Sequence, residues 1–146
     1  MTSPYRLVVA LCLASAAQLL PAHAEDVPPA VQAMLDNFER QSSIKPSYET
    51  IETDGSGNVT ITNLTMNKDA ANGGPAITTK VAEVSLSEIS DEGDGLYEIG
   101  SATFSDMSAS ITGNGFAMTI TMPEGEAEDW YVRSVTADAA PEDQFR

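Results

Sequence analysis

Cysteine and histidine are almost absent from this chain. Its 146 residues include one of each, Cys12 and His23, and both lie within residues 1–24. Residues 25–146 therefore can form no disulfide and contain neither a cysteine nucleophile nor an imidazole. They also lack the usual general base near neutral pH and the commonest zinc ligand. These absences exclude most thiol-dependent and histidine-dependent catalysis from that part of the chain.

Basic residues are scarce as well. The chain has 7 Lys and Arg against 22 Asp and Glu, a net charge of −15. The negative electrostatic potential of such a chain repels phosphate backbones and anionic lipid surfaces, because binding to both depends on Lys and Arg. Nucleic acid is therefore excluded as a partner. The length suits one domain with one core.

Residues 1–24 have the pattern of a secretory signal peptide. Arg6 precedes an apolar run from Leu7 to Leu20, and Ala22-His23-Ala24 places small residues before a cleavage site at Glu25. The run is shorter than the roughly 20 apolar residues that a membrane-spanning helix needs. We expect cleavage, export to the periplasm or alternatively to the extracellular space, and a mature protein that is not integral to the membrane. Its charge would be −16, from six basic and 22 acidic residues.

The segment 25–45 predicts an amphipathic helix, running from about Pro28 to Ser42. Proline suits the first helical turn, and Lys45-Pro46 ends the pattern. Apolar residues recur at the spacing of one helical face: Val31, Met34, Leu35 and Phe38. The polar face has too little positive charge for a membrane-surface helix, so we expect this helix to pack on the protein's own sheet.

Residues 46–136 predict an antiparallel β domain, because Val, Ile and Thr dominate and turn-forming clusters recur. The expected strands are 47–53, 58–66, 76–89, 96–111, 116–122 and 130–136, and the expected turns include 54–57, 112–115 and 123–125. The predicted fold is α+β and mostly β, with one N-terminal helix packed on a curved antiparallel β-meander of about five or six strands. Residues 137–146 are small, acidic and contain proline, which predicts a disordered tail or the start of a linker.

A weak repeat of about 18–20 residues runs through the strands. Its three copies are Ile61-x-x-Leu64-x-Met66, Val81-x-x-Val84-x-Leu86-x-x-Ile89 and Ile99-x-x-Ala102-x-Phe104-x-x-Met107. In each copy the apolar spacing shifts between two residues and three. A β-bulge has this effect on a strand with one buried face, so we expect bulges and a curved sheet.

The helix is too small to cover the sheet. A helix of 15 residues covers on the order of 220 Å², whereas six strands present a face of about 750 Å². The rest of the face would be covered by the sheet curling on itself, by another chain or missing segment, or by an apolar ligand.

The clearest apolar stripe alternates along the strand 116–122. We interpret it as an ordinary strand that fills the core; the alternative is that it forms, together with Met107, a soft face for a ligand or partner. The candidate residues are Phe116, Met118, Ile120, Met122 and Met107.

Two acidic loops are candidate calcium sites. The cluster Asp91, Glu92, Asp94 and Glu98 offers several oxygen ligands, although charged loop tips are usually solvated. Asp54-Gly55-Ser56-Gly57-Asn58 resembles the start of a calcium loop, but Val59 stands where glycine is required. We therefore interpret that segment as a hairpin turn. No bound metal and no other cofactor are expected, and the Asp91 cluster stays the weaker alternative.

Two segments of the chain carry a resemblance to a known group of proteins: Val59-Thr60-Ile61-Thr62-Asn63-Leu64-Thr65 and Leu96-Tyr97-Glu98-Ile99-Gly100-Ser101-Ala102-Thr103-Phe104. With the export signal and short helix, they resemble the start of Gram-negative envelope proteins that stack long β-meanders into a groove, including relatives of the AsmA-like lipid-transfer group. The resemblance covers residues 25–136 and lies in the general residue pattern, without a diagnostic motif. It transfers no functional residue. It implies a role in the envelope that involves apolar molecules.

The leading hypothesis is an exported, non-enzymatic envelope protein. It would bind an apolar ligand or a protein partner on the uncovered sheet face. Two alternatives stay open: a glycan hydrolase that uses a pair of carboxylates, and a purely structural or interaction module.

Overall fold

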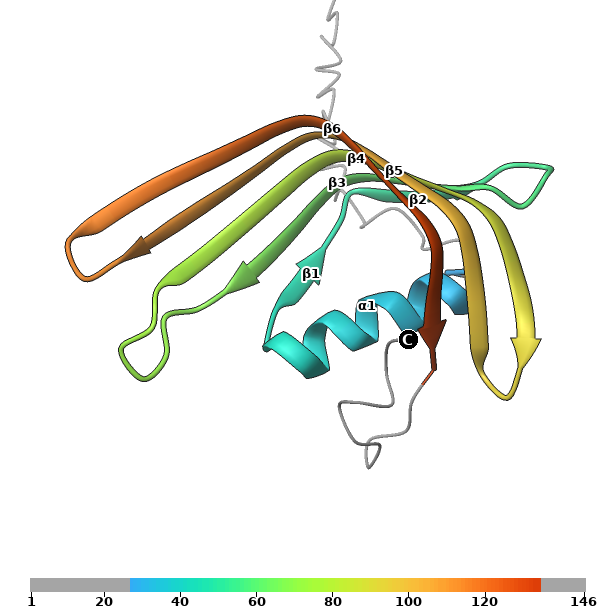
Figure 1. Cartoon of the computed structure of the whole chain (residues 1–146), viewed down its shortest axis with the longest axis horizontal. Coiled ribbons are helices and arrows are strands. Elements are labelled where there is room, and N and C mark those ends of the chain that lie inside the picture. Colours follow the sequence, from blue (N-terminus) through green and yellow to red (C-terminus); the bar gives the residue numbers. More distant parts are fainter. Residues whose placement is uncertain (1–26, 135–146) are drawn as a thin grey trace, which may run out of the picture.

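The computed structural model describes residues 27–134, and the predicted signal peptide and tail lie outside this range. Six antiparallel strands form a single open sheet, and one helix packs on one side of it (Figure 1). This arrangement confirms the predicted fold class. The elements are α1 (Pro29–Ser42), β1 (Lys45–Ser47), β2 (Thr50–Thr53), β3 (Val59–Lys68), β4 (Ala76–Gly93), β5 (Leu96–Gly113) and β6 (Phe116–Arg133). Within the described range, no helix is long and apolar enough to cross a membrane.

Helix α1 forms where the periodicity predicts it. Proline occupies its first turn, and Ser43 ends it in the left-handed conformation with φ 50°. The predicted apolar face is buried: Val31, Met34 and Leu35 are 0%, 2% and 6% exposed. Figure 1 shows this helix under the concave side of the arched sheet.

A buried amide ties the helix to the last strand. Asn37 is fully buried, and its Nδ2 donates a hydrogen bond of 3.0 Å to the main-chain oxygen of Arg133. The two residues lie 96 positions apart in the chain. This bond joins the first and last elements of the described fold.

The strands follow one another as a meander. β3, β4, β5 and β6 are neighbours in chain order, and β1 and β2 both pair with β3. β5 and β6 are joined by Asn114-Gly115, both with positive φ, the conformation of a two-residue hairpin turn. Among the strands of residues 27–134, β6 pairs only with β5, so within this range its outer edge is open.

The predicted boundary within 116–136 is wrong. We expected Pro123-Glu124-Gly125 to be a turn between two strands, but β6 runs without interruption from Phe116 to Arg133. Proline removes an N–H group, which costs no ladder hydrogen bond when that group would face the open edge of a sheet. Along 116–122, the N–H groups of residues 117, 119 and 121 face the open edge. Position 123 continues this alternation, so the N–H that Pro123 lacks would also face the edge.

The predicted phase change is real, but its cause is not a β-bulge. Around Asn63, the pairs Thr62↔Glu83 and Leu64↔Val81 keep the same register, so neither strand has an extra residue. A register shift occurs instead beside the β4–β5 turn, between Asp91 and Gly93. The prediction of a bulge in each repeat was therefore wrong.

Left-handed residues reset the alternation instead. Four strand residues have φ near 50°: Asn63, Glu88, Asp106 and Asp129. Asn63 and Asp106 adjoin one row across the sheet, which we call the first bend line: Thr62, Glu83, Ser105 and Glu124. Glu88 and Asp129 adjoin a second row, the second bend line: Ile89, Ile99 and Trp130.

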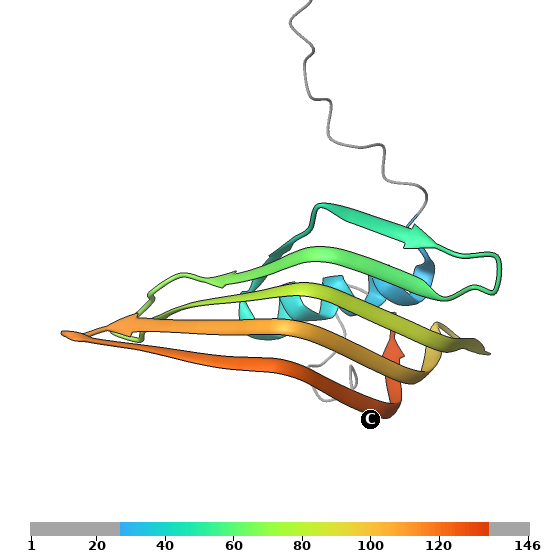
Figure 2. The ribbon, with the colours of Figure 1, turned by 90° about the horizontal axis from the view of Figure 1, so that it is seen from above.

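The bend lines keep apolar side chains on the concave face. Ile61 and Leu64, on either side of the first line, are 0% and 3% exposed although they are three residues apart. The same line also separates β1 from β2, since Ser47 pairs with Thr65 and Thr50 with Thr62. The predicted single strand 47–53 is therefore two strands. Figures 1 and 2 show the result, an arched sheet whose β5–β6 hairpin extends beyond α1.

Candidate functional site

An apolar cavity lies between α1 and the concave face of the sheet. Its volume is about 210 Å³, and eleven of its twelve lining residues are apolar. The helix contributes Met34 and Phe38, and β6 contributes Ala127 and Trp130. The strands between them supply Leu64, Met66, Val81, Val84, Ala102, Thr103, Phe104 and Met107.

Two aromatic contacts shape this cavity. The rings of Phe38 and Trp130 are 6.5 Å apart, tilted by 45°, and join α1 to β6. Phe104 lies across Gly125, its register partner on β6, so closely that a Cβ there would be 2.0 Å from the ring. Glycine on an edge strand is commonly covered by an aromatic ring in this way. The Phe104 ring therefore fills the space that the side chain of any other residue at position 125 would occupy.

The candidate ligand or partner face divides into two parts. Met107 is partly buried against the core and lines the cavity. The other four residues lie on β6 and are exposed by 50%, 47%, 45% and 40%: Phe116, Met118, Ile120 and Met122. They do not fill the core, so the interpretation of this stretch as an ordinary core strand is wrong. Met107 pairs with Met122, so the cavity adjoins this exposed row.

Sequence reasoning did not identify the cavity residues on the helix and on the end of β6. Met34 and Phe38 were assigned to a core-packing face, and Trp130 to the opening of a separate strand. The available signal was the same apolar periodicity that marks any core helix. A cavity depends on how closely the helix approaches the sheet, which this periodicity does not encode.

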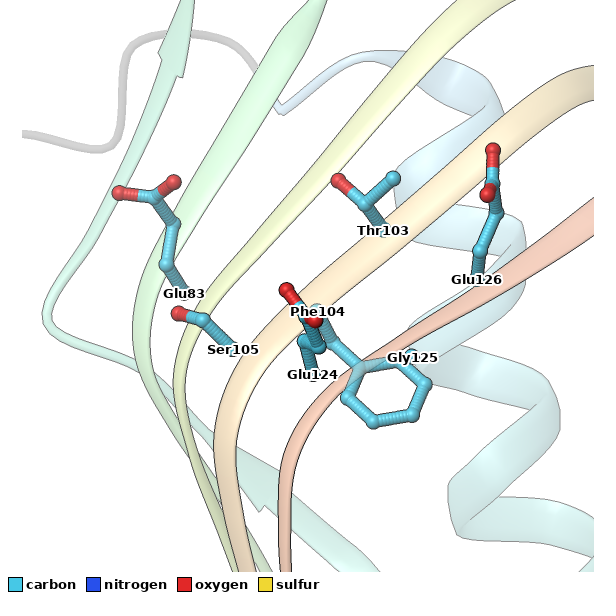
Figure 3. Close-up of a pocket in the computed structure, with 7 residues that line it drawn as sticks. All are labelled: Glu83, Thr103, Phe104, Ser105, Glu124, Gly125 and Glu126. Carbon is cyan, nitrogen blue, oxygen red and sulfur yellow. The ribbon is translucent and has the colours of Figure 1, made fainter.

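A second hollow, of about 500 Å³, is lined by three glutamates, Glu83, Glu124 and Glu126, all of them exposed (Figure 3). Glu83, Ser105 and Glu124 occupy one register row on three adjacent strands. Glu83 and Glu124 are separated by two strand spacings, so their backbones lie about 10 Å apart. This hollow is where the carboxylate-pair alternative would find its acidic groups.

The carboxylates of the candidate calcium cluster accept hydrogen bonds from other groups of the protein. Asp91 accepts one from the N–H of Gly93 at 2.9 Å, and Glu92 accepts one from Ser90 at 2.6 Å. Glu98 accepts one from the Tyr131 hydroxyl at 3.0 Å, and this bond raises the pKa of Tyr131. Among residues 27–134, no three His, Cys, Asp or Glu side chains are grouped to hold a metal ion.

The Asp54 loop is a hairpin turn, as its sequence indicates. Asp54 accepts hydrogen bonds from the Asn58 side chain at 2.9 Å and from the N–H groups of Ser56 and Asn58 at 2.8 and 3.0 Å. These bonds, led by that of the Asn58 side chain, lower the pKa of Asp54. Its carboxylate oxygens therefore stabilise the loop between β2 and β3.

Replacing Gly125 by alanine is expected to lower the free energy of unfolding by about 1–3 kcal/mol, because the Phe104 ring must leave its position. Urea unfolding measures the change. Gly55→Ala is the matched control, since a Cβ there meets nothing within 4 Å and its φ is not positive. Equal stability of the two variants would contradict the assigned role of the Phe104 ring.

The geometry is not shared with a recognised relative. Comparison with protein-family models, curated proteins and solved structures gives no match to this chain. The resemblance to AsmA-like envelope proteins therefore stays a prediction, and the function has to be argued from the cavity, the exposed apolar row and the charge.

Proposed function

We propose that this is an exported, non-enzymatic protein that binds an apolar molecule under the arch of its sheet. The observation that supports the proposal is the apolar cavity of about 210 Å³ between α1 and the strands. Cavities lined by apolar side chains exclude water and accept apolar ligands, because water would find no hydrogen-bond partners there. Thr103 supplies the one polar lining residue.

The surroundings of the cavity favour an elongated ligand. Met34, Met66 and Met107 line the cavity, and methionine adapts its shape to different apolar groups. Met107 pairs with Met122, which belongs to the exposed apolar row on β6. A ligand longer than the cavity would extend along this row and cover it.

The charge of the chain restricts the polar end of such a ligand. With a net charge of −15, the protein repels anionic groups at low ionic strength. The ligand class that fits is therefore a lipid-like molecule with a neutral or cationic polar group. Anionic phospholipids and fatty-acid carboxylates fit less well.

Ala127→Phe tests this proposal. Ala127 is exposed and lines the cavity, so a larger side chain there occupies the mouth without overpacking the core. We expect the variant to bind a fluorescent apolar probe at least about tenfold more weakly, a loss of about 1.4 kcal/mol. Native mass spectrometry of the purified protein, followed by lipid extraction, would identify a bound ligand.

The matched control is Ala117→Phe, which places the same side chain on the same strand. Ala117 alternates with the exposed apolar row and therefore points to the opposite face of the sheet. It should leave probe binding unchanged. A protein that binds no probe and carries no lipid would reject the proposal in favour of the structural or interaction alternative.

A further inference from the structure

The tip of the β5–β6 hairpin has an unusual composition for this chain. From Met107 to Pro123 it contains no charged residue, although the chain as a whole has 22 acidic and 7 basic residues. Asp106 and Glu124 bound the uncharged stretch on either side. Exposed edge strands usually carry charges, because an uncharged edge pairs readily with another strand. Here the open edge of β6 along 116–122 has no such protection.

The main-chain groups of this edge alternate in direction. In a two-residue hairpin the flanking residues, here Gly113 and Phe116, form a hydrogen-bonded pair. Every second residue of β6 then bonds to β5, and the residues between them direct their N–H and C=O groups outward. The outward-facing residues of the uncharged segment are Ala117, Thr119 and Thr121.

We propose that a second copy of this chain pairs with this edge, antiparallel, with the two-fold axis at Thr119. This register joins Thr119 to its own copy and Ala117 to Thr121, so all outward groups find partners in about six inter-chain hydrogen bonds. The same register sets Phe116 opposite Met122 and Met118 opposite Ile120. Both pairs lie on the concave face, where their members are 40–50% exposed in one chain.

Charge selects the antiparallel direction. The second half of β6 contains Glu124, Glu126, Glu128 and Asp129. Parallel pairing would place each of these residues beside its own copy, and directly opposed like charges are destabilising. With the axis at Thr119, position 123 meets position 115 in the hairpin turn, so pairing ends there. The two acidic halves then lie at opposite ends of the joined sheet.

The inference does not depend on ligand binding, because it concerns the edge of β6 and not the cavity. Joining two copies at this edge extends one sheet across both chains and aligns the two exposed apolar rows. A symmetric interface of this kind closes on itself, since each copy uses the uncharged edge of β6 once. The expected assembly is a dimer without further growth.

Cysteine cross-linking tests the register. In a Cys12→Ser background, Thr119→Cys places the two sulfur-bearing residues about 5.5 Å apart at Cα, within the range that a disulfide accepts. In the control Ala117→Cys, the two copies of residue 117 are about 14 Å apart at Cα. We expect the first variant to cross-link on oxidation and the second not to. Equal cross-linking of both would overturn the register.

Sedimentation velocity over a concentration series tests the dimer itself. Thr119→Pro removes an outward N–H and no β5–β6 bond, so it should keep the fold and weaken dimerisation at least about tenfold. If that variant unfolds, Thr119→Glu replaces it, with Ser110→Glu as control. Ser110 is the register partner of Thr119 on β5, one strand from the edge. A wild-type chain that stays monomeric to millimolar concentration would reject the proposal.

Discussion

Replacing Leu86 by alanine is expected to lower the free energy of unfolding by about 2–5 kcal/mol. Leu86 is 1% exposed and lies in β4, between its register partners Val59 on β3 and Ala102 on β5. Truncation removes buried apolar surface and leaves a cavity at the centre of the sheet. Urea unfolding, followed by circular dichroism, would measure the loss as a lower midpoint with an unchanged slope.

Ser90→Ala is the control for this experiment. Ser90 lies on the same strand, is exposed, and makes one exposed hydrogen bond to Glu92. Its replacement should change stability by no more than about 0.5 kcal/mol. Leu86 does not line the apolar cavity, so its truncation should reduce stability without altering the affinity for an apolar probe under folding conditions. A small effect at Leu86 would contradict the assigned core.

Placing valine at both left-handed positions of the first bend line should cost about 2–4 kcal/mol, because a left-handed conformation costs an L-residue about 1–2 kcal/mol. The variant is Asn63→Val with Asp106→Val, whose φ angles are 49° and 48°. Asparagine and aspartate tolerate this conformation better than most residues, whereas β-branched residues rarely adopt it. Thermal and urea unfolding of the double variant would measure the cost.

The control for the bend is Ser110→Val, an exposed position on β5 where φ is not positive. Valine favours extended strands, so this substitution should be neutral or slightly stabilising. A double variant as stable as the wild type would show that the left-handed residues do not set the curvature of the sheet.

Much of the fold follows from local chemistry in the sequence. The apolar spacing of α1 and its prolines define that helix, and Asn114-Gly115 defines the β5–β6 turn, because each signal acts within a few neighbouring residues. The three-residue spacing in the repeat also marks where the sheet bends. Its structural cause was missed, since an inserted residue and a left-handed residue produce the same apolar pattern in one strand.

Tertiary structure decided the features that depend on a partner strand or on the depth of packing. Pro123 indicates a turn in the sequence, but on the open edge of β6 its missing N–H costs no hydrogen bond, and the strand continues. The exposure of the predicted row at Phe116 follows from the reach of the hairpin beyond α1. The cavity arises because the helix and the bent sheet do not approach closely enough to fill the space between them. Local sequence signals identify the apolar residues and most of the turns, whereas the register and the bend of the sheet select the apolar residues that enclose that space.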